Sequence, residues 1–149
     1  MFNENLKLSG QVDIVLRDKN GNVKEERTEK NLVVTTGLGY IASRMKDASA
    51  TAMTHMALGS GTTAAAAGQT DIVTLLGARE ALDSTTVTAN AVAYVASFEA
   101  GDATGAVTEA GIFNASTSGT MLCRTVFSVV NKAADDTMTV TWTITVSAS

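Results

Sequence analysis

The sequence predicts an all-β protein, an antiparallel β-sandwich or a jelly-roll-like barrel with one short helix near residues 37–46. Two observations carry this prediction. Residues 137–146 alternate threonine with an apolar residue, so a strand there has one hydroxyl face and one apolar face. In the second half of the chain, stretches rich in β-branched residues recur about every ten residues, with turn residues between them.

The first predicted element is a hairpin at about residues 10–30. Residues 12–18 are largely apolar on one face, and Asn20-Gly21 follows, a pair that tolerates the positive φ of a tight turn. The returning strand, from Val23 to about Lys30, is heavily charged, which indicates a solvent-facing or edge strand. We expect a single domain over residues 1–149, with this hairpin as a part that can project and pack elsewhere.

A short helix is predicted next, because apolar residues recur at helical spacing and Thr36 can cap its start. The apolar positions are Leu38, Ile41, Ala42 and Met45. A strand over residues 53–58 and a long loop of small residues follow, and Thr70 can begin a single helical turn. The remaining predicted strands are 81–88, 91–99, 106–114, 121–130 and 137–146. The strand at 121–130 is almost wholly apolar, which predicts that both its faces are covered.

Composition excludes several classes of function. The net charge is −4 and the basic residues are scattered among acidic ones, which argues against a nucleic-acid partner. No segment approaches the length of a membrane span and no signal peptide is visible, so we expect no membrane partner. Only 17% of residues are charged, and a surface of Thr, Ser, Ala and Gly can pack against neighbours without desolvating many ions.

No residue pattern indicates catalysis, a metal or a cofactor, so we expect a protein that is not an enzyme. Cys123 is the single cysteine, which excludes an internal disulfide and a cysteine metal cluster, and on an apolar strand it predicts a buried, inert thiol. His55 has no carboxylate near it in sequence, which favours a structural histidine. The loop Gly59–Thr63 lacks the Lys-Ser/Thr of a phosphate loop, and its glycines allow a sharp or left-handed path.

Four residues stand out as candidate interface or structural residues: Glu109, Gly111, Phe113 and Arg124. A charge such as Arg124 in an apolar strand should be paired or lie at an interface. Glu109 in the preceding strand is its expected partner, within the protomer or across a subunit contact. Gly111 indicates a bulge or a close approach of backbones. Ile112 and Phe113 point to opposite faces, so one belongs to the core and the other to a contact.

Three segments resemble a group of small structural proteins of tailed bacteriophages. The segments are Lys30–Met45, Met56–Thr63, and Thr108–Asn114 followed by Gly119–Phe127. Their order is similar to that family: an N-L-V-x-x-x-G entry to a helix, an M-A-x-G-x-G-T-T loop, and E-A-G-I-F-N and M-L-x-R-T-x-F strands. The resemblance implies a structural role in the virion and supplies no catalytic residues.

From the resemblance and the small, weakly charged β domain, we expect a capsid decoration or cement protein that bridges capsid subunits. The alternative is a tail component, such as a short fibre, an adaptor or a baseplate-associated protein. A host-glycan-binding module is a third hypothesis, but aromatic residues are few and do not cluster. The expected partners are other copies of this chain, as a dimer or trimer, and the major capsid protein or tail proteins. The expected location is the virion, assembled in the cytoplasm of the bacterial host.

Overall fold

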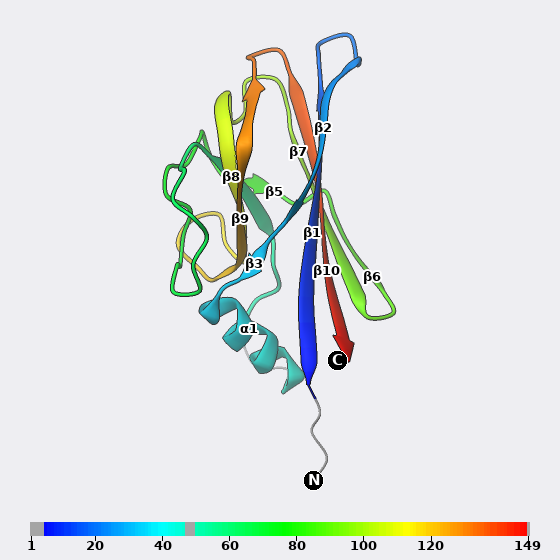
Figure 1. Ribbon diagram of the computed structural model, residues 1–149, viewed down its shortest axis with the longest axis vertical. Coiled ribbons are helices and arrows are strands. Elements are labelled where there is room, and N and C mark those ends of the chain that lie inside the picture. Colours follow the sequence, from blue (N-terminus) through cyan, green and yellow to red (C-terminus); the bar gives the residue numbers. More distant parts are fainter. Residues whose placement is uncertain (1–4, 47–49, 149) are drawn as a thin grey trace.

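The chain folds into two antiparallel five-stranded sheets that face each other, so the predicted all-β sandwich is confirmed (Figure 1). The computed structural model describes residues 5–46 and 50–148. In spatial order, the first sheet contains β2 (Val23–Lys30), β1 (Leu6–Arg17), β10 (Thr137–Ala148), β7 (Ala91–Phe98) and β6 (Ser84–Thr88). The second sheet contains β3 (Leu32–Val33), β9 (Met121–Lys132), β8 (Gly105–Phe113), β4 (His55–Gly59) and β5 (Glu80–Ala81).

The main core lies between the two sheets, and the alternation in β10 places it there. Met138, Val140, Trp142 and Ile144 are buried and belong to the main hydrophobic cluster, which Ile112 and Leu122 join from the second sheet. The intervening threonines of β10 stay half-exposed on the opposite face. Each large apolar side chain enclosed in this way contributes about 1.5–3 kcal/mol to folding.

The N-terminal hairpin is an integral part of the first sheet. β1 pairs with β10 along its whole length, from Leu6 opposite Ala148 to Arg17 opposite Thr137, while β2 forms the charged edge. Gly21 takes a positive φ of 83° in the predicted turn. The Asp18 carboxylate accepts the backbone N–H groups of the turn at 2.9 and 3.0 Å, which fixes the turn without proline.

The single helix, α1 (Thr35–Met45), starts slightly earlier than expected and is capped differently. Val34 occupies the N-cap position, and the Thr36 hydroxyl donates instead to the Met121 carbonyl at 3.2 Å, so Thr36 joins the helix to β9. Gly37 is buried, and a Cβ there would overlap the backbone carbonyl of Leu122. The helix therefore needs glycine at this position to approach the second sheet closely.

Three further expectations, about strands and loops, are corrected by the structure. The predicted strand at 81–88 is two strands, because β5 pairs with β4 in the second sheet whereas β6 pairs with β7 in the first. The helical turn expected at Thr70 does not form, and residues 60–79 run as an irregular loop beside the second sheet (Figure 1). β9 is covered on both faces over its first half, but Ser128 and Val129 are exposed.

Candidate functional site

Glu109 on β8 and Arg124 on β9 form a fully buried ion pair, as the sequence predicted for an internal salt bridge. The Glu109 Oε1 atom accepts the Arg124 Nη2–H at 2.9 Å and the Nε–H at 3.2 Å. Both side chains are 0% exposed. They lie diagonally across the strand pair, since the register places Arg124 opposite Gly111 and Glu109 opposite Val126.

The pair fastens the loop at residues 60–79, which sequence reasoning did not anticipate. The Glu109 carboxylate accepts backbone N–H groups from Gly61, Val73 and Thr74 at 2.6, 2.8 and 2.9 Å. The Arg124 Nη1 atom donates to the Thr63 carbonyl and to the side chain of a glutamine in the same loop, both at 2.9 Å. Both ions are thus satisfied inside the protomer, as buried charges must be.

These hydrogen bonds keep Glu109 charged. Burial alone would raise the pKa of Glu109, but the N–H groups of Val73 and Thr74, the Arg124 guanidinium and the N–H of Gly61 together hold that pKa below its ordinary value. A carboxylate whose oxygens already accept hydrogen bonds, and which solvent does not reach, is not available to exchange a proton with a substrate. The arrangement is built for structure rather than for acid–base chemistry.

Gly59 and Gly61 serve this loop by leaving space, not by adopting a left-handed path. Neither has a positive φ, which corrects the expectation from the sequence. A Cβ on Gly61 would overlap the Glu109 carboxylate, and one on Gly59 would overlap the Thr74 carbonyl. Sequence reasoning recognised that glycine was needed here, but the buried acid that requires it comes from a distant strand.

Gly111 and Phe113 are also enclosed by their own chain rather than exposed for a contact. Phe113 is 0% exposed in a second cluster with Val34, Ala57, Ile72 and Met121, while Ile112 points into the main core. The Arg79 guanidinium lies over the Phe113 ring, 3.5 Å from its centroid. A Cβ on Gly111 would lie 3.1 Å from the side chains of Ile72 and Phe113, so the close approach at this glycine is made by side chains and not by the backbone that the sequence led us to expect.

The remaining reactive side chains are placed as structural residues. Cys123 is fully buried, and burial raises the pKa of its thiol well above the ordinary value, so the reactive thiolate is disfavoured. His55 Nδ1 shares a 2.8 Å hydrogen bond with the hydroxyl of Thr54. Within residues 5–46 and 50–148, no group of three or more His, Cys, Asp or Glu residues could hold a metal ion. None of the helices described there is long and apolar enough to cross a membrane.

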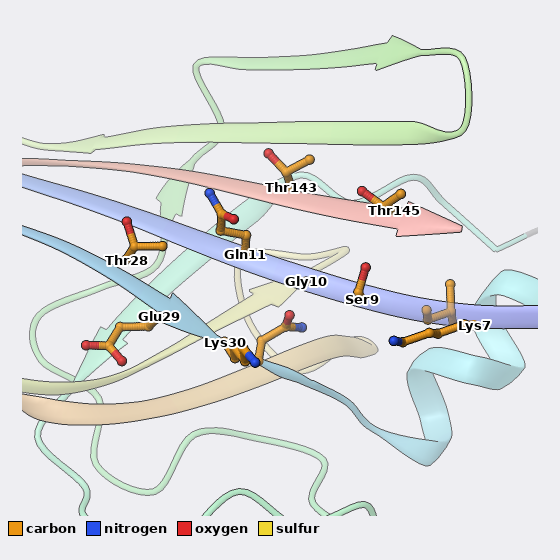
Figure 2. A pocket seen from close by; sticks show the side chains of 11 residues that line it. Lys7, Ser9, Gly10, Gln11, Thr28, Glu29, Lys30, Thr143 and Thr145 are labelled. Carbon is orange, nitrogen blue, oxygen red and sulfur yellow. The ribbon is translucent and has the colours of Figure 1, made fainter. Parts of the chain in front are cut away.

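The surface contains a polar hollow of about 590 Å³ where β1 and β2 separate (Figure 2). Lys7 and Lys30 stand at its rim, and the hydroxyl groups of Ser9, Thr143 and Thr145 lie on the same side of the sheet. Its lining mixes lysines with a glutamate and hydroxyl groups. It is therefore an open depression of mixed polarity in the sheet rather than an enclosed ligand site.

A broader feature is the outer face of the first sheet beyond β1, which we call the threonine face. It consists of the outward side chains of three strands: Thr139, Thr141, Thr143 and Thr145 of β10, Ala93, Val95 and Ser97 of β7, and Ser84, Thr86 and Thr88 of β6. All these side chains are small and none is charged. The β10 and β7 members are half-buried by their neighbours, whereas the β6 members are exposed.

An apolar groove of about 410 Å³ opens between α1 and the ends of β6, β7 and β10. Tyr40 and Ile41 line its helix side, and Val87 and Val146 line its sheet side. Tyr94 also lines the groove, and burial raises the pKa of its phenol to about 12. The groove arises because the first sheet extends beyond the second at this end of the molecule, where α1 lies (Figure 1).

Comparison of the chain with protein-family models, with curated proteins and with solved structures found no significant match.

Proposed function

We propose that this chain is a structural protein of a tailed-bacteriophage particle, and more narrowly a capsid decoration or cement protein. In this role it bridges neighbouring capsid subunits in the virion, after assembly in the host cytoplasm. Its partners are the major capsid protein and other copies of itself. The proposal starts from the three sequence segments that resemble such proteins.

The three segments share a structural role in this fold. Gly37, Gly61, Glu109 and Arg124 come from the resembling segments, and all four lie where the helix or the long loop is fastened to the second sheet. These residues maintain the scaffold. A similarity that includes these scaffold residues supports a shared fold and leaves the contact surfaces to be identified separately.

The observation that carries the proposal is the threonine face. It is built on regular strands, and its own side chains carry no charge. Asp13, opposite Thr141, and Asp83, hydrogen-bonded to Ser97, lie at its border, so a partner can cover its central part without desolvating ions. Small side chains lose little rotamer freedom when they are covered. Each contact of this kind is modest, but repetition over a capsid lattice multiplies the binding strength.

The deciding experiment measures the number of copies of this chain in purified particles, by quantitative mass spectrometry against the major capsid protein. A cement protein is present in numbers comparable to the capsid protein and rebinds to emptied heads. A few copies per particle would support the tail alternative instead. Absence from purified particles would exclude a virion role.

A matched pair of variants tests the threonine face itself. Ala93→Lys places a charge at the centre of this face, between Thr143 and Thr86, and should reduce binding to emptied heads by at least about tenfold, because the charge must be desolvated. Val129→Lys places the same charge on an exposed position of β9 in the other sheet and should leave binding unchanged. Equal binding by both variants would place the contact surface elsewhere on the molecule.

A further inference from the structure

The open edges of the two sheets differ in how they are protected against pairing with another chain. An edge strand presents unpaired N–H and C=O groups, and proteins protect such edges by making them short or charged. In the described part of the chain, the second sheet ends in β3 and β5, each two residues long. The first sheet ends on one side in β2, which carries six charged residues among eight. These three edges are protected.

The fourth edge, β6, has neither form of protection. Its sequence is Ser84-Thr-Thr-Val-Thr88, five residues that are all exposed and uncharged. Threonine and valine favour strands, and Val87 is 69% exposed. The β6–β7 hairpin extends away from the second sheet, and β6 ends the strand order of its own sheet, so β7 is its one neighbouring strand (Figure 1).

We propose that β6 is a self-association edge, and that its occupant is β6 of a second copy of this chain. Two identical antiparallel strands pair around a two-fold axis, which gives a closed dimer with one continuous sheet. Full overlap of the five residues places Thr86 of one copy directly opposite Thr86 of the other. This inference specifies the self-association contained in the proposed function, and to that extent it rests on that function.

The distribution of side chains fits this symmetric pairing. With Thr86 at the axis, Thr85 of one copy faces Val87 of the other, so the apolar grooves on the inner side of the sheet come together. The nearest charge before β6, Asp83, comes opposite Ala89 of the second copy, so no like charges meet. On the outer side, Thr86, Ala93 and Thr143 lie in one row across the sheet. The dimer therefore continues the threonine face across the axis.

The size of the contact sets its strength. Five residues from each copy make a smaller contact than a typical stable interface, so we expect a dissociation constant on the order of micromolar for the isolated protein. Sedimentation velocity of the wild-type protein should show a monomer–dimer equilibrium. A wild-type protein that stays monomeric up to about 0.1 mM would overturn the proposal.

Cross-linking tests the position of the axis without weakening the contact. Directly opposite residues of an antiparallel pair have Cα atoms about 4.5–5.5 Å apart, within the range of a disulfide. Thr86→Cys should therefore give a covalent dimer under mild oxidation, while the buried Cys123 stays unreactive. The matched control is Val23→Cys, a 48% exposed position on the charged edge β2. If Thr86→Cys cross-links no faster than Val23→Cys, the proposed pairing is wrong.

A charge-swap experiment tests the two-fold symmetry. Thr86→Lys and Thr86→Glu each place like charges opposite each other at the axis, so each protein alone should be monomeric. An equimolar mixture places opposite charges there and should restore the dimer. Thermal melting of each variant checks that the fold is intact, and Val23→Lys should dimerise as the wild type does. A mixture that stays monomeric, or single variants that remain dimeric, would contradict the pairing.

These measurements use the purified protein and do not involve the phage particle. Dimers that form through β6 in a protein absent from virions would leave this inference standing and refute the proposed function. A protein that stays monomeric yet decorates heads at high copy number would refute this inference and leave the proposed function standing.

Discussion

At the scale of single residues, the stability of the protein depends on keeping both members of the buried pair Glu109–Arg124. Removing one member of a buried ion pair leaves the other charged and desolvated, at a cost of about 3–5 kcal/mol. We therefore expect Glu109→Gln to lower the free energy of unfolding by about that amount, measured by urea denaturation. Glu26→Gln, at an exposed position on β2, is the control and should change stability by less than about 0.5 kcal/mol.

The same carboxylate makes the free energy of unfolding depend on pH in the acidic range. The pKa of Glu109 is lower in the folded protein than in the unfolded chain, so the unfolded chain binds a proton first as the pH falls. The contribution of Glu109 to the free energy of unfolding is fully present above its pKa in the unfolded chain and is lost as the pH falls through its pKa in the folded protein. Denaturation curves from pH 7 to pH 2 should therefore show a steeper loss for the wild type than for Glu109→Gln. Parallel profiles would show that another group dominates.

Tyr94 has the opposite dependence, at alkaline pH. Its pKa is raised to about 12 by burial, compared with 10.0 for a free tyrosine. Between these values the unfolded chain loses the phenolic proton while the folded protein keeps it, so stability falls as the pH rises. The loss reaches about 2–3 kcal/mol. Tyr94→Phe should remove this part of the alkaline loss, measured by urea denaturation at alkaline pH, whereas Tyr40→Phe, whose phenol adds to the raised pKa of Tyr94, should reduce it only in part.

At the scale of elements, the loop at residues 60–79 covers part of the second sheet and is fastened to it by the Glu109–Arg124 pair. Gly61→Ala would push a methyl group into the Glu109 carboxylate, so we expect a loss of stability of about 1–3 kcal/mol. Gly68→Ala in the same loop meets no atom within 4 Å and takes no positive φ, so it should be close to neutral. Thermal melting of the two variants compares them directly.

The strands that the sequence predicted well are those whose neighbours follow a simple pattern. β10 alternates because one of its faces packs in the core and the other faces solvent. Such alternation can be recognised from the sequence of one strand alone. The split between β5 and β6 was not visible, because a change of sheet at Leu82 and Asp83 alters the partner of a strand and leaves its composition the same. The stacking of Arg79 on Phe113 likewise joins residues whose proximity depends on the path of the long loop.

The candidate residues were identified correctly as special, but only part of their role could be predicted. An arginine in an apolar strand requires a partner, and this requirement, together with the place of Glu109 in the preceding strand, predicted the pair. The three backbone N–H groups that complete the site belong to residues without any distinctive chemistry: Gly61, Val73 and Thr74. Nothing in their side chains indicates a bond made by their backbone.

At the scale of the whole molecule, the two proposed contacts belong to one sheet and should therefore reinforce each other. If two copies pair through β6, each dimer carries two threonine faces side by side and can bind a lattice at two points. Because Thr86 also belongs to the threonine face, the matched control is Thr88→Lys, which places the same charge on that face away from the axis. Avidity then predicts that monomeric Thr86→Lys binds emptied heads at least about tenfold more weakly than Thr88→Lys. The equimolar mixture with Thr86→Glu should recover the affinity. Unchanged binding by the monomer would show that attachment does not use the dimer.

Because the single thiol of this protein, that of Cys123, is buried, its chemical labelling reports how often the fold opens. A small alkylating reagent can reach Cys123 only when the structure around it opens, by separation of the two sheets or by release of β3, which pairs with it. The labelling rate in native buffer therefore measures how often such opening happens. Without any added tag, the same measurement made on free protein and on assembled particles would show how much a surrounding lattice slows the opening of each copy.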